Sequence, residues 1–189
     1  MNILAVDTAG KTAGVALLQD DRLLYEVYLD GGMTHSETLM PMIDSCLKMC
    51  GLTCADIDLY AVNAGPGSFT GLRIGLAAVK GLAFPRETLC APVSTLEALA
   101  AAHTGEGTVL CALDARRAQV YSAAFDLATH TRLLDDDARA VTDLADFVEK
   151  LQKALFLLVM ARVCAIINTA MCRACCKHPR RCGAAVPLP

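Results

Sequence analysis

The chain has 189 residues, a formal net charge of −3, and a composition that is 54% hydrophobic and 20% charged. A chain this rich in apolar residues is not disordered. The sequence pI of about 5.8 disfavours a domain that binds nucleic acid by itself, because such domains are usually strongly basic. At this length a chain buries roughly 70% of its unfolded surface, so it needs neither disulfides nor a structural metal. We expect one domain, or two small lobes that share a core.

The balance of acidic and basic residues changes abruptly near residue 150. All 20 Asp and Glu lie in residues 1–149, and 10 Lys and Arg in the same stretch leave it with a net charge of −10. Residues 150–189 hold the other 7 basic residues, no acidic residue and five of the ten Cys. A folded domain rarely stops using acidic residues in this way, so we treat the two stretches separately. The other five Cys lie in apolar patterns and are expected to be reduced and buried.

Three apolar strands are predicted at the N-terminus, over residues 2–6, 14–19 and 23–29. The acidic pair Asp20-Asp21 marks a tight turn, so the second and third strands form a hairpin. From residue 36 onward the patterns alternate: helices are expected over 36–50, 72–84, 95–103 and 143–153, and strands over 58–63, 90–93, 109–113 and 119–125. This order predicts an α/β fold with a mixed sheet of βββαβα type and flanking helices.

A Gly-rich turn between Gly65 and Gly71 follows a strand and opens a helix. Free backbone N–H groups at a helix N-terminus suit an anion. The spacing matches neither a Walker loop nor the dinucleotide fingerprint, so a turn that packs the helix tightly on its strand is the favoured interpretation. The candidate phosphate or nucleotide contacts are Asp7, Gly65, Gly67, Ser68 and Thr70.

Two helices have faces suited to close packing. Small residues recur along helix 72–84, which lets another helix approach, either within the chain or from a partner. Helix 36–50 has a Met-rich apolar stripe that is wider than one buried face needs. The candidate partner-interface residues on these helices are Leu39, Met42, Ile43, Cys46, Gly71, Gly75 and Ala78.

Other chemical motifs are weak. No Gly-x-Ser-x-Gly elbow is present. Asp114 with Arg116-Arg117 predicts a solvated hairpin with a surface ion pair of little energetic value. No two His stand at metal-ligand spacing in the sequence, where they are His35, His103, His130 and His178. We therefore expect no catalytic residue and no metal site.

Three motifs in this order resemble the bacterial TsaB (YeaZ) family: ILAVDTA at residues 3–9, HSETLMP at 35–41 and GPGSFTGLRIG at 65–75. The third motif is the most specific, and the resemblance covers about residues 1–150. It implies the actin-like, sugar-kinase-like ATPase fold. It also implies a role in making threonylcarbamoyladenosine beside the anticodon of tRNA.

The resemblance further implies a subunit that is not itself the catalyst. It would pair with a homologous TsaD-like catalytic subunit through helices 36–50 and 72–84, work with a TsaE-like ATPase, and meet tRNA through the complex. We expect no cofactor for the chain itself, although ATP or ADP could bind in the complex, and a homodimer could form in isolation. Asp7 interrupts the first apolar run, so we expect no secretory signal, no membrane segment and a cytoplasmic location. The alternatives are a free-standing ATP-dependent phosphotransferase of the same fold, a peptidase, or a homodimeric interaction protein.

The chain is expected to divide into an N-terminal actin-like lobe over residues 1–105, the start of a second lobe over 106–157, and an aberrant tail over 158–189. Family members continue after the last predicted helix with a strand and a Gly-Asp-Gly turn. Codons for Leu-Val-Met-Ala at 158–161, read from the last base of the Leu codon, permit Gly-Asp-Gly and force its second Gly. We therefore interpret the tail as the product of a frameshift, which leaves the second lobe incomplete. A zinc knuckle is the alternative for the tail, formed by Cys172, Cys175, Cys176, His178 and Cys182.

Overall fold

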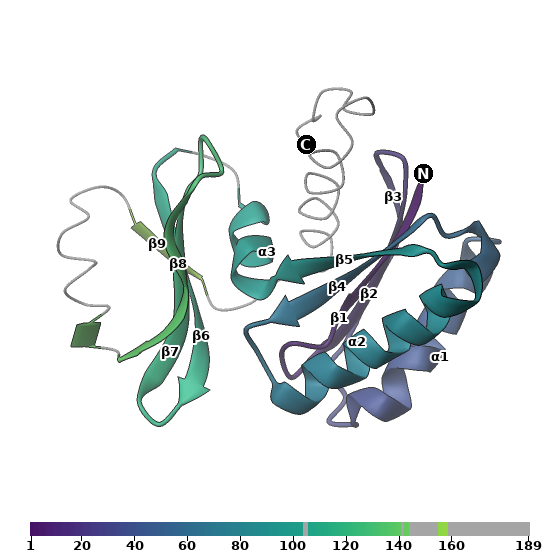
Figure 1. Cartoon of the computed structure of the whole chain (residues 1–189), viewed down its shortest axis with the longest axis horizontal. Coiled ribbons are helices and arrows are strands. Elements are labelled where there is room, and N and C mark those ends of the chain that lie inside the picture. The colour runs from purple at the N-terminus through teal and green to yellow at the C-terminus, as the bar shows by residue number, and fades with distance from the viewer. Residues whose placement is uncertain (104–105, 141, 144–154, 159–189) are drawn as a thin grey trace.

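A computed structural model describes residues 1–103, 106–140, 142–143 and 155–158 of the chain. The described residues form two lobes, each built around its own sheet (Figure 1). The strand order is β3-β2-β1-β4-β5 in the first sheet and β8-β7-β6-β9 in the second. No helix among the described residues is long and apolar enough to cross a membrane.

The first sheet is mixed, as its sequence predicted. Strands β1 (Asn2–Asp7), β2 (Ala13–Gln19) and β3 (Arg22–Leu29) pair antiparallel, which confirms the expected hairpins. Strands β4 (Leu59–Gly65) and β5 (Leu89–Ser94) then extend the sheet in parallel from β1. The C-terminal ends of β1 and β4 therefore lie side by side at one edge of this sheet.

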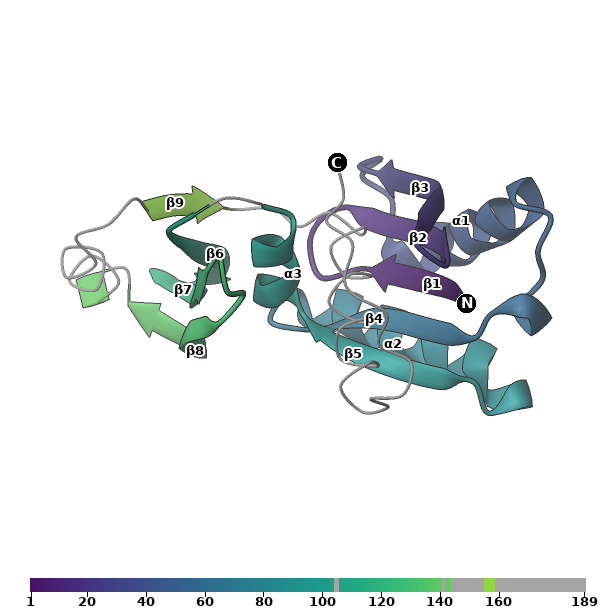
Figure 2. The same ribbon diagram turned by 90° about the horizontal axis from the view of Figure 1, so that it is seen from above.

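Two helices cover one face of this sheet (Figure 2). Helix α1 (His35–Met49) begins one residue earlier than predicted because Thr34 is its N-cap, and the Thr34 backbone N–H donates to Glu37 Oε2 at 3.0 Å. Helix α2 (Phe69–Ala83) begins after the N-cap Ser68. Two 3₁₀ turns follow the helices, at Cys54–Asp56 and Phe84–Arg86.

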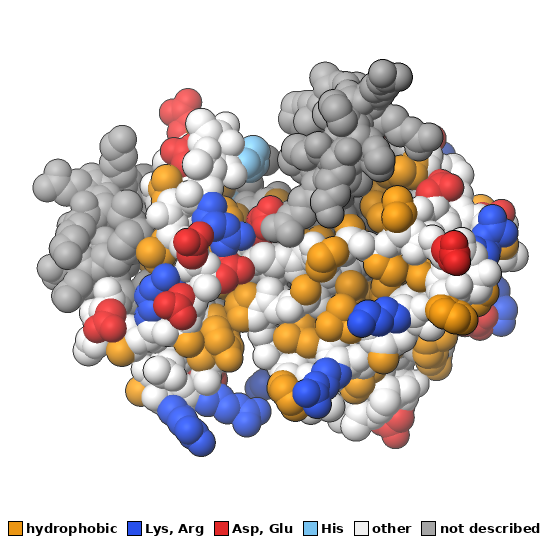
Figure 3. Space-filling model, in the orientation of Figure 1, with side chains coloured by type: hydrophobic (Ala, Val, Ile, Leu, Met, Phe, Trp, Pro, Cys, Tyr) orange, Lys and Arg blue, Asp and Glu red, His pale blue; other side chains and the backbone are white. Residues whose placement is uncertain are grey.

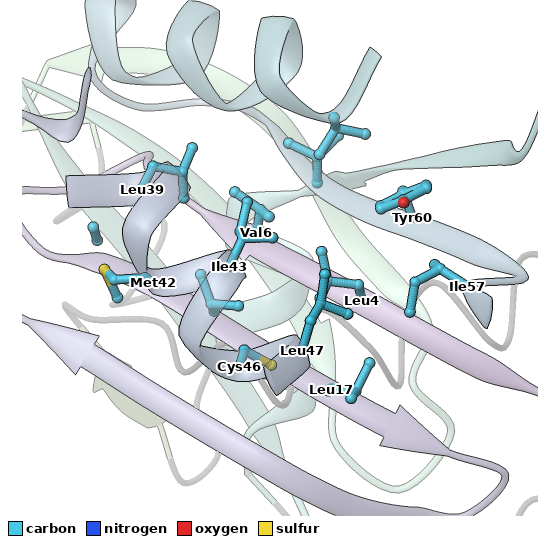
Figure 4. Close-up of a cluster of buried hydrophobic side chains, with 14 of the residues drawn as sticks. Leu4, Val6, Leu17, Leu39, Met42, Ile43, Cys46, Leu47, Ile57 and Tyr60 are labelled. Carbon is cyan, nitrogen blue, oxygen red and sulfur yellow. The ribbon is translucent and has the colours of Figure 1, made fainter. Parts of the chain in front are cut away.

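The core between α1 and the sheet is shown in Figure 4. Side chains of β1 and β2, including Leu4, Val6 and Leu17, meet the apolar stripe of α1. The helix residues in this core include four that the sequence assigned to a partner interface, Leu39, Met42, Ile43 and Cys46, which are at most 8% exposed. The structure corrects that assignment, because these side chains contact the chain's own sheet. Burial also raises the pKa of the Cys46 thiol to about 12, as expected of a reduced, buried cysteine.

The second lobe contains β6 (Thr108–Arg116), β7 (Gln119–Asp126), β8 (Arg132–Ala140) and β9 (Leu155–Leu158). Strand β8 was not predicted, because its three consecutive Asp residues are untypical of a strand. Strand β9 pairs parallel with β6 and lies just before the expected change of reading frame. Of the helix expected over 143–153, only the first residue lies in the described part of the chain.

Helix α3 (Thr95–Ala101) joins the two lobes. Its Ala98 packs on the second face of the first sheet, while Leu96 and Leu99 pack on β6 and β7. An ion pair reinforces this joint: Arg132 of β8 pairs with Glu97 of α3, and a second ion pair joins Arg132 to Asp136 within β8. The guanidinium carbon of Arg132 also lies 4.6 Å from the centre of the Phe125 ring. The lobes are therefore connected by both apolar and ionic contacts.

Candidate functional site

Asp7 is the last residue of β1, and its side chain is held from two sides. Its Oδ1 accepts hydrogen bonds from the Ala9 backbone N–H at 2.9 Å and from Asn63 Nδ2 at 2.7 Å. Only 7% of the residue is exposed. Burial raises the pKa of the Asp7 carboxyl above its ordinary value, and the two hydrogen bonds and the nearby His35 oppose that rise. The folded chain therefore binds a proton at Asp7 more readily than the unfolded chain does.

Asn63, which the sequence analysis did not select, lies beside Asp7 on β4. Its Oδ1 is buried and has no hydrogen-bond partner among the described residues, and the same is true of Thr95 Oγ1. Val6 and Val62 belong to the core beneath the helices, so the next residue on each strand faces the opposite side of the sheet. A polar residue at the end of an otherwise apolar strand was the available sequence signal for Asn63.

The Gly-rich turn is fastened to the turn between β1 and β2. Thr8 Oγ1 donates to the Gly71 carbonyl at 2.8 Å, and the Ser68 N–H donates to the Ala9 carbonyl at 2.7 Å. A Cβ atom at Gly71 would lie 2.1 Å from the Thr8 carbonyl oxygen, and one at Gly75 would lie 2.4 Å from Thr8 Oγ1. Both glycines are therefore needed for contact within the chain. This geometry confirms the tight-packing interpretation of the turn, and it corrects the assignment of Gly71 and Gly75 to a partner interface.

The same contacts decide what the start of α2 can bind. Ser68 Oγ accepts the Gly71 N–H at 3.3 Å as the helix cap, and a Cβ at Gly67 would lie 2.6 Å from the Ala9 carbonyl oxygen. The Ala9 carbonyl oxygen thus packs against the part of the loop that a phosphate would have to approach. Asp7, Gly67 and Ser68 come together around Ala9. Ser68 and Thr70 line one hollow, and Gly65 and Gly67 line a second.

The first hollow lies between the starts of α1 and α2 and has a volume of about 380 Å³. Lys11, Asp30 and His35 supply its charged or titratable side chains, and His35 Nε2 lies 3.0 Å from the Gly10 carbonyl oxygen. The second hollow, of about 560 Å³, lies between the Gly-rich turn and the second sheet. Tyr121 and Asp136 line it, and neither was selected from the sequence.

The solvent side of α2 differs from its inner side. Phe69 and Phe84 are 68% and 84% exposed at the two ends of the helix, and Met40 of α1 is 46% exposed. A Cβ at Gly81 would meet no atom of the described part of the chain within 4 Å. Ala78, the remaining interface candidate, is partly buried against the core. We use the name outer α2 face for the exposed residues Ala77, Gly81 and Phe84.

Comparisons with known proteins agree on one family. The family model described as TsaD, tRNA N6-adenosine threonylcarbamoyltransferase, matches residues 31–163, which is more than half of the chain. The chain is 39% identical over 126 residues to the tRNA threonylcarbamoyladenosine biosynthesis protein TsaB of Bacillus subtilis (strain 168), covering 66% of this chain and 55% of that protein. It is 38% identical over 128 residues to the protein of the same name from Escherichia coli (strain K12), with the same two coverages.

A solved structure extends the agreement from sequence to fold. The structure titled YeaZ from Pseudomonas aeruginosa superposes with a TM-score of 0.75 and 26% identity, covering 93% of each chain. The chain nevertheless spans only about half the length of the curated relatives it matches. Given the family match, the shared mixed sheet and the TsaB relatives, this chain belongs to the threonylcarbamoyltransferase-like family with the actin-like fold, in its TsaB (YeaZ) branch.

Proposed function

We propose that this chain is a non-catalytic subunit in the biosynthesis of threonylcarbamoyladenosine in tRNA. It pairs with a homologous TsaD-type subunit that performs the transfer, and a TsaE-type ATPase acts on the pair. Transfer RNA reaches the chain through this complex. The names of the relatives and the family model support the pathway, since both refer to this modification.

The outer α2 face is the observation that carries the pairing. Glycine inside a helix costs about 1 kcal/mol relative to alanine, so its presence needs a reason. Gly71 and Gly75 have such a reason within the chain, but no atom of the described residues lies within 4 Å of the Cβ position of Gly81. A second helix that packs closely at Gly81, between the apolar Ala77 and Phe84, explains the missing side chain.

The inner side of α2 supports the non-catalytic part of the proposal. The carbonyl groups of Thr8 and Ala9 pack against the turn at the start of the helix. The Asp7 carboxylate accepts hydrogen bonds from Ala9 and Asn63. A phosphotransferase would need this region open to a nucleotide phosphate and its metal ion. We therefore assign any ATP or ADP to the assembled complex rather than to this chain alone.

Reconstitution tests the proposal. The purified chain is mixed with the TsaD-type and TsaE-type proteins of the same genome, with tRNA, ATP, threonine and bicarbonate, and with the enzyme that forms the threonylcarbamoyl donor. Nucleoside mass spectrometry is expected to detect the modified adenosine in the full mixture and not when this chain is omitted. Steady ATP turnover by the isolated chain that Asp7→Ala abolishes would instead establish the phosphotransferase alternative.

Sedimentation then separates pairing from self-association. We expect the chain and the TsaD-type subunit to sediment as one species of equal stoichiometry, even when the chain alone forms a homodimer. A homodimer that persists unchanged in the presence of the TsaD-type subunit would contradict the proposal and favour a homodimeric interaction protein.

A further inference from the structure

The turn between β6 and β7 has an unusual backbone. Arg116, Arg117 and Ala118 have φ angles of 65°, 53° and 57°, so three consecutive residues with a Cβ are left-handed. Such residues are strained in this conformation, which glycine adopts without a Cβ clash. The sequence thus keeps two arginines at positions where glycine would relieve strain, and strain of this kind is often retained at functional sites.

The two arginines of this turn are exposed and form no ion pair with any described residue. Arg116 and Arg117 are the only adjacent basic residues in residues 1–149. Neither forms an ion pair with a described carboxylate, whereas Arg132 and Arg139 of the same lobe do. Asp114 does not pair with them as the sequence predicted: its Oδ1 accepts the Arg116 backbone N–H at 2.7 Å. Asp114 therefore shapes the turn, and both guanidinium groups lack a carboxylate partner among the described residues.

The turn lies apart from the outer α2 face. In Figure 1 the β6–β7 turn is at the lower end of the second lobe, while α1 and α2 belong to the first. Figure 3 shows Lys and Arg side chains gathered at this lower end of the molecule. A subunit bound on the outer α2 face would leave the turn open to a further ligand.

We infer that Arg116 and Arg117 bind the phosphate backbone of the tRNA substrate, an inference that rests on the proposed function. A guanidinium group matches phosphate with two parallel hydrogen bonds, and contacts of this kind fix register and orientation without reading sequence. Residues 1–149, which span both lobes, carry a net charge of −10, so this part of the chain repels RNA except where basic groups are exposed. The two arginines then orient the tRNA on the complex, while other subunits supply most of the affinity.

The test measures tRNA affinity of the complex with the TsaD-type subunit as a function of salt concentration. Each phosphate contact that is lost lowers the slope of log affinity against log salt by about 1. We expect Arg116→Gln and Arg117→Gln each to weaken binding about fivefold at 0.1 M salt, and the double variant to lower the slope by about 2. The double lysine variant keeps the charge and is expected to retain most of the affinity.

Ala118→Gly is the matched control, because it relieves the same backbone strain without changing charge. It is expected to raise the melting temperature and to leave tRNA affinity and the salt slope unchanged. Arg117→Gly is expected to be at least as stable as the parent while binding tRNA more weakly. This opposite response of stability and binding would not arise from a merely structural turn.

The outcomes separate this inference from the proposed function. If the Gln variants pair with the TsaD-type subunit and bind tRNA with parental affinity and slope, the inference is wrong and the proposed function stands. If the Gln variants lose the TsaD-type subunit instead, the turn binds an acidic protein surface and the inference is also wrong. If the parent chain does not pair with that subunit at all, the proposed function fails and the inference fails with it.

Discussion

The two sides of α2 use small residues for different purposes. On the inner side, Gly71 and Gly75 leave room for the backbone and hydroxyl of Thr8, and the helix is fastened there by hydrogen bonds. On the outer side, no residue in the described ranges lies against Gly81. Spacing along the helix is the same in both cases, so sequence periodicity cannot tell an internal contact from an external one. The inner side therefore serves folding, and the outer side is where we propose that a partner binds.

The largest expected effect is on the inner side. Gly71→Ala places a Cβ at 2.1 Å from the Thr8 carbonyl oxygen, which is backbone and cannot swing away. We expect a loss of about 3 kcal/mol or more in the free energy of unfolding, at the upper end of overpacking effects. Urea unfolding followed by circular dichroism measures it. A Gly71→Ala protein as stable as the parent would show that the contact with Thr8 is not tight.

The inner side also makes stability depend on pH through Asp7. Burial raises the pKa of this carboxyl in the folded chain above the ordinary value of 3.8, so the folded state binds the proton more tightly than the unfolded state. This contribution to stability is fully present below pH 3.8 and is lost as the pH rises through the folded pKa. Asp7→Asn keeps an acceptor for Ala9 and Asn63 but removes the buried charge.

We therefore expect Asp7→Asn to be more stable than the parent at pH 7 and to lose this part of the pH dependence. Asp7→Ala, the control, leaves the Ala9 N–H and Asn63 Nδ2 without their acceptor and is expected to be less stable than Asp7→Asn. Melting temperatures between pH 4 and pH 8 give both comparisons. Parallel curves for the parent and Asp7→Asn would mean that the Asp7 carboxyl is not perturbed.

A smaller effect of opposite sign is expected on the outer side. Gly81→Ala adds a Cβ to open space in a helix and should stabilise the chain by roughly 0.5–1 kcal/mol. The same urea titration as for Gly71→Ala measures the change. Destabilisation by Gly81→Ala would mean that the outer side is not open, and the distinction between the two sides would disappear.

No effect is expected from metal removal. The zinc alternative involves Cys172, Cys175, Cys176, His178 and Cys182, which lie outside the described residues. A structural zinc would add several kcal/mol to folding, so its removal by EDTA would lower the melting temperature. If the tail arises from a frameshift, the melting temperature stays the same. Resequencing codons 155–162 then shows a gained or lost base, whereas an intact frame together with one bound zinc per chain would sustain the zinc alternative.

Most of the first lobe could be predicted because its signals are local. Short local patterns predict each of its elements: alternating apolar residues for the strands, Asp20-Asp21 for the turn and the apolar stripe for α1. The strands pair as expected. The second lobe was harder. Strand β8 forms because it pairs with β7. Its own composition, with three consecutive Asp residues, does not favour a strand, so it could not be predicted from the sequence.

The site was predicted only in part. Asp7, Gly67 and Ser68 were selected from motif and position as phosphate contacts, which stays a prediction, whereas their contacts with Ala9 could be learned only from the structure. The interface residues were assigned to the wrong side of α1, because an apolar stripe looks the same whether it meets the chain's own sheet or a partner. Asn63 and Tyr121 were missed because each matters through a neighbour that is distant in the sequence.

The pairing role of the outer α2 face is tested most directly by titrating the TsaD-type subunit into Gly81→Leu and Gly81→Ala in a calorimeter. We expect Gly81→Leu to fold at least as stably as the parent and to weaken pairing by about 1–3 kcal/mol, or roughly 5- to 150-fold. Gly81→Ala is expected to weaken it less. A well-folded Gly81→Leu chain that pairs with parental affinity would contradict the account.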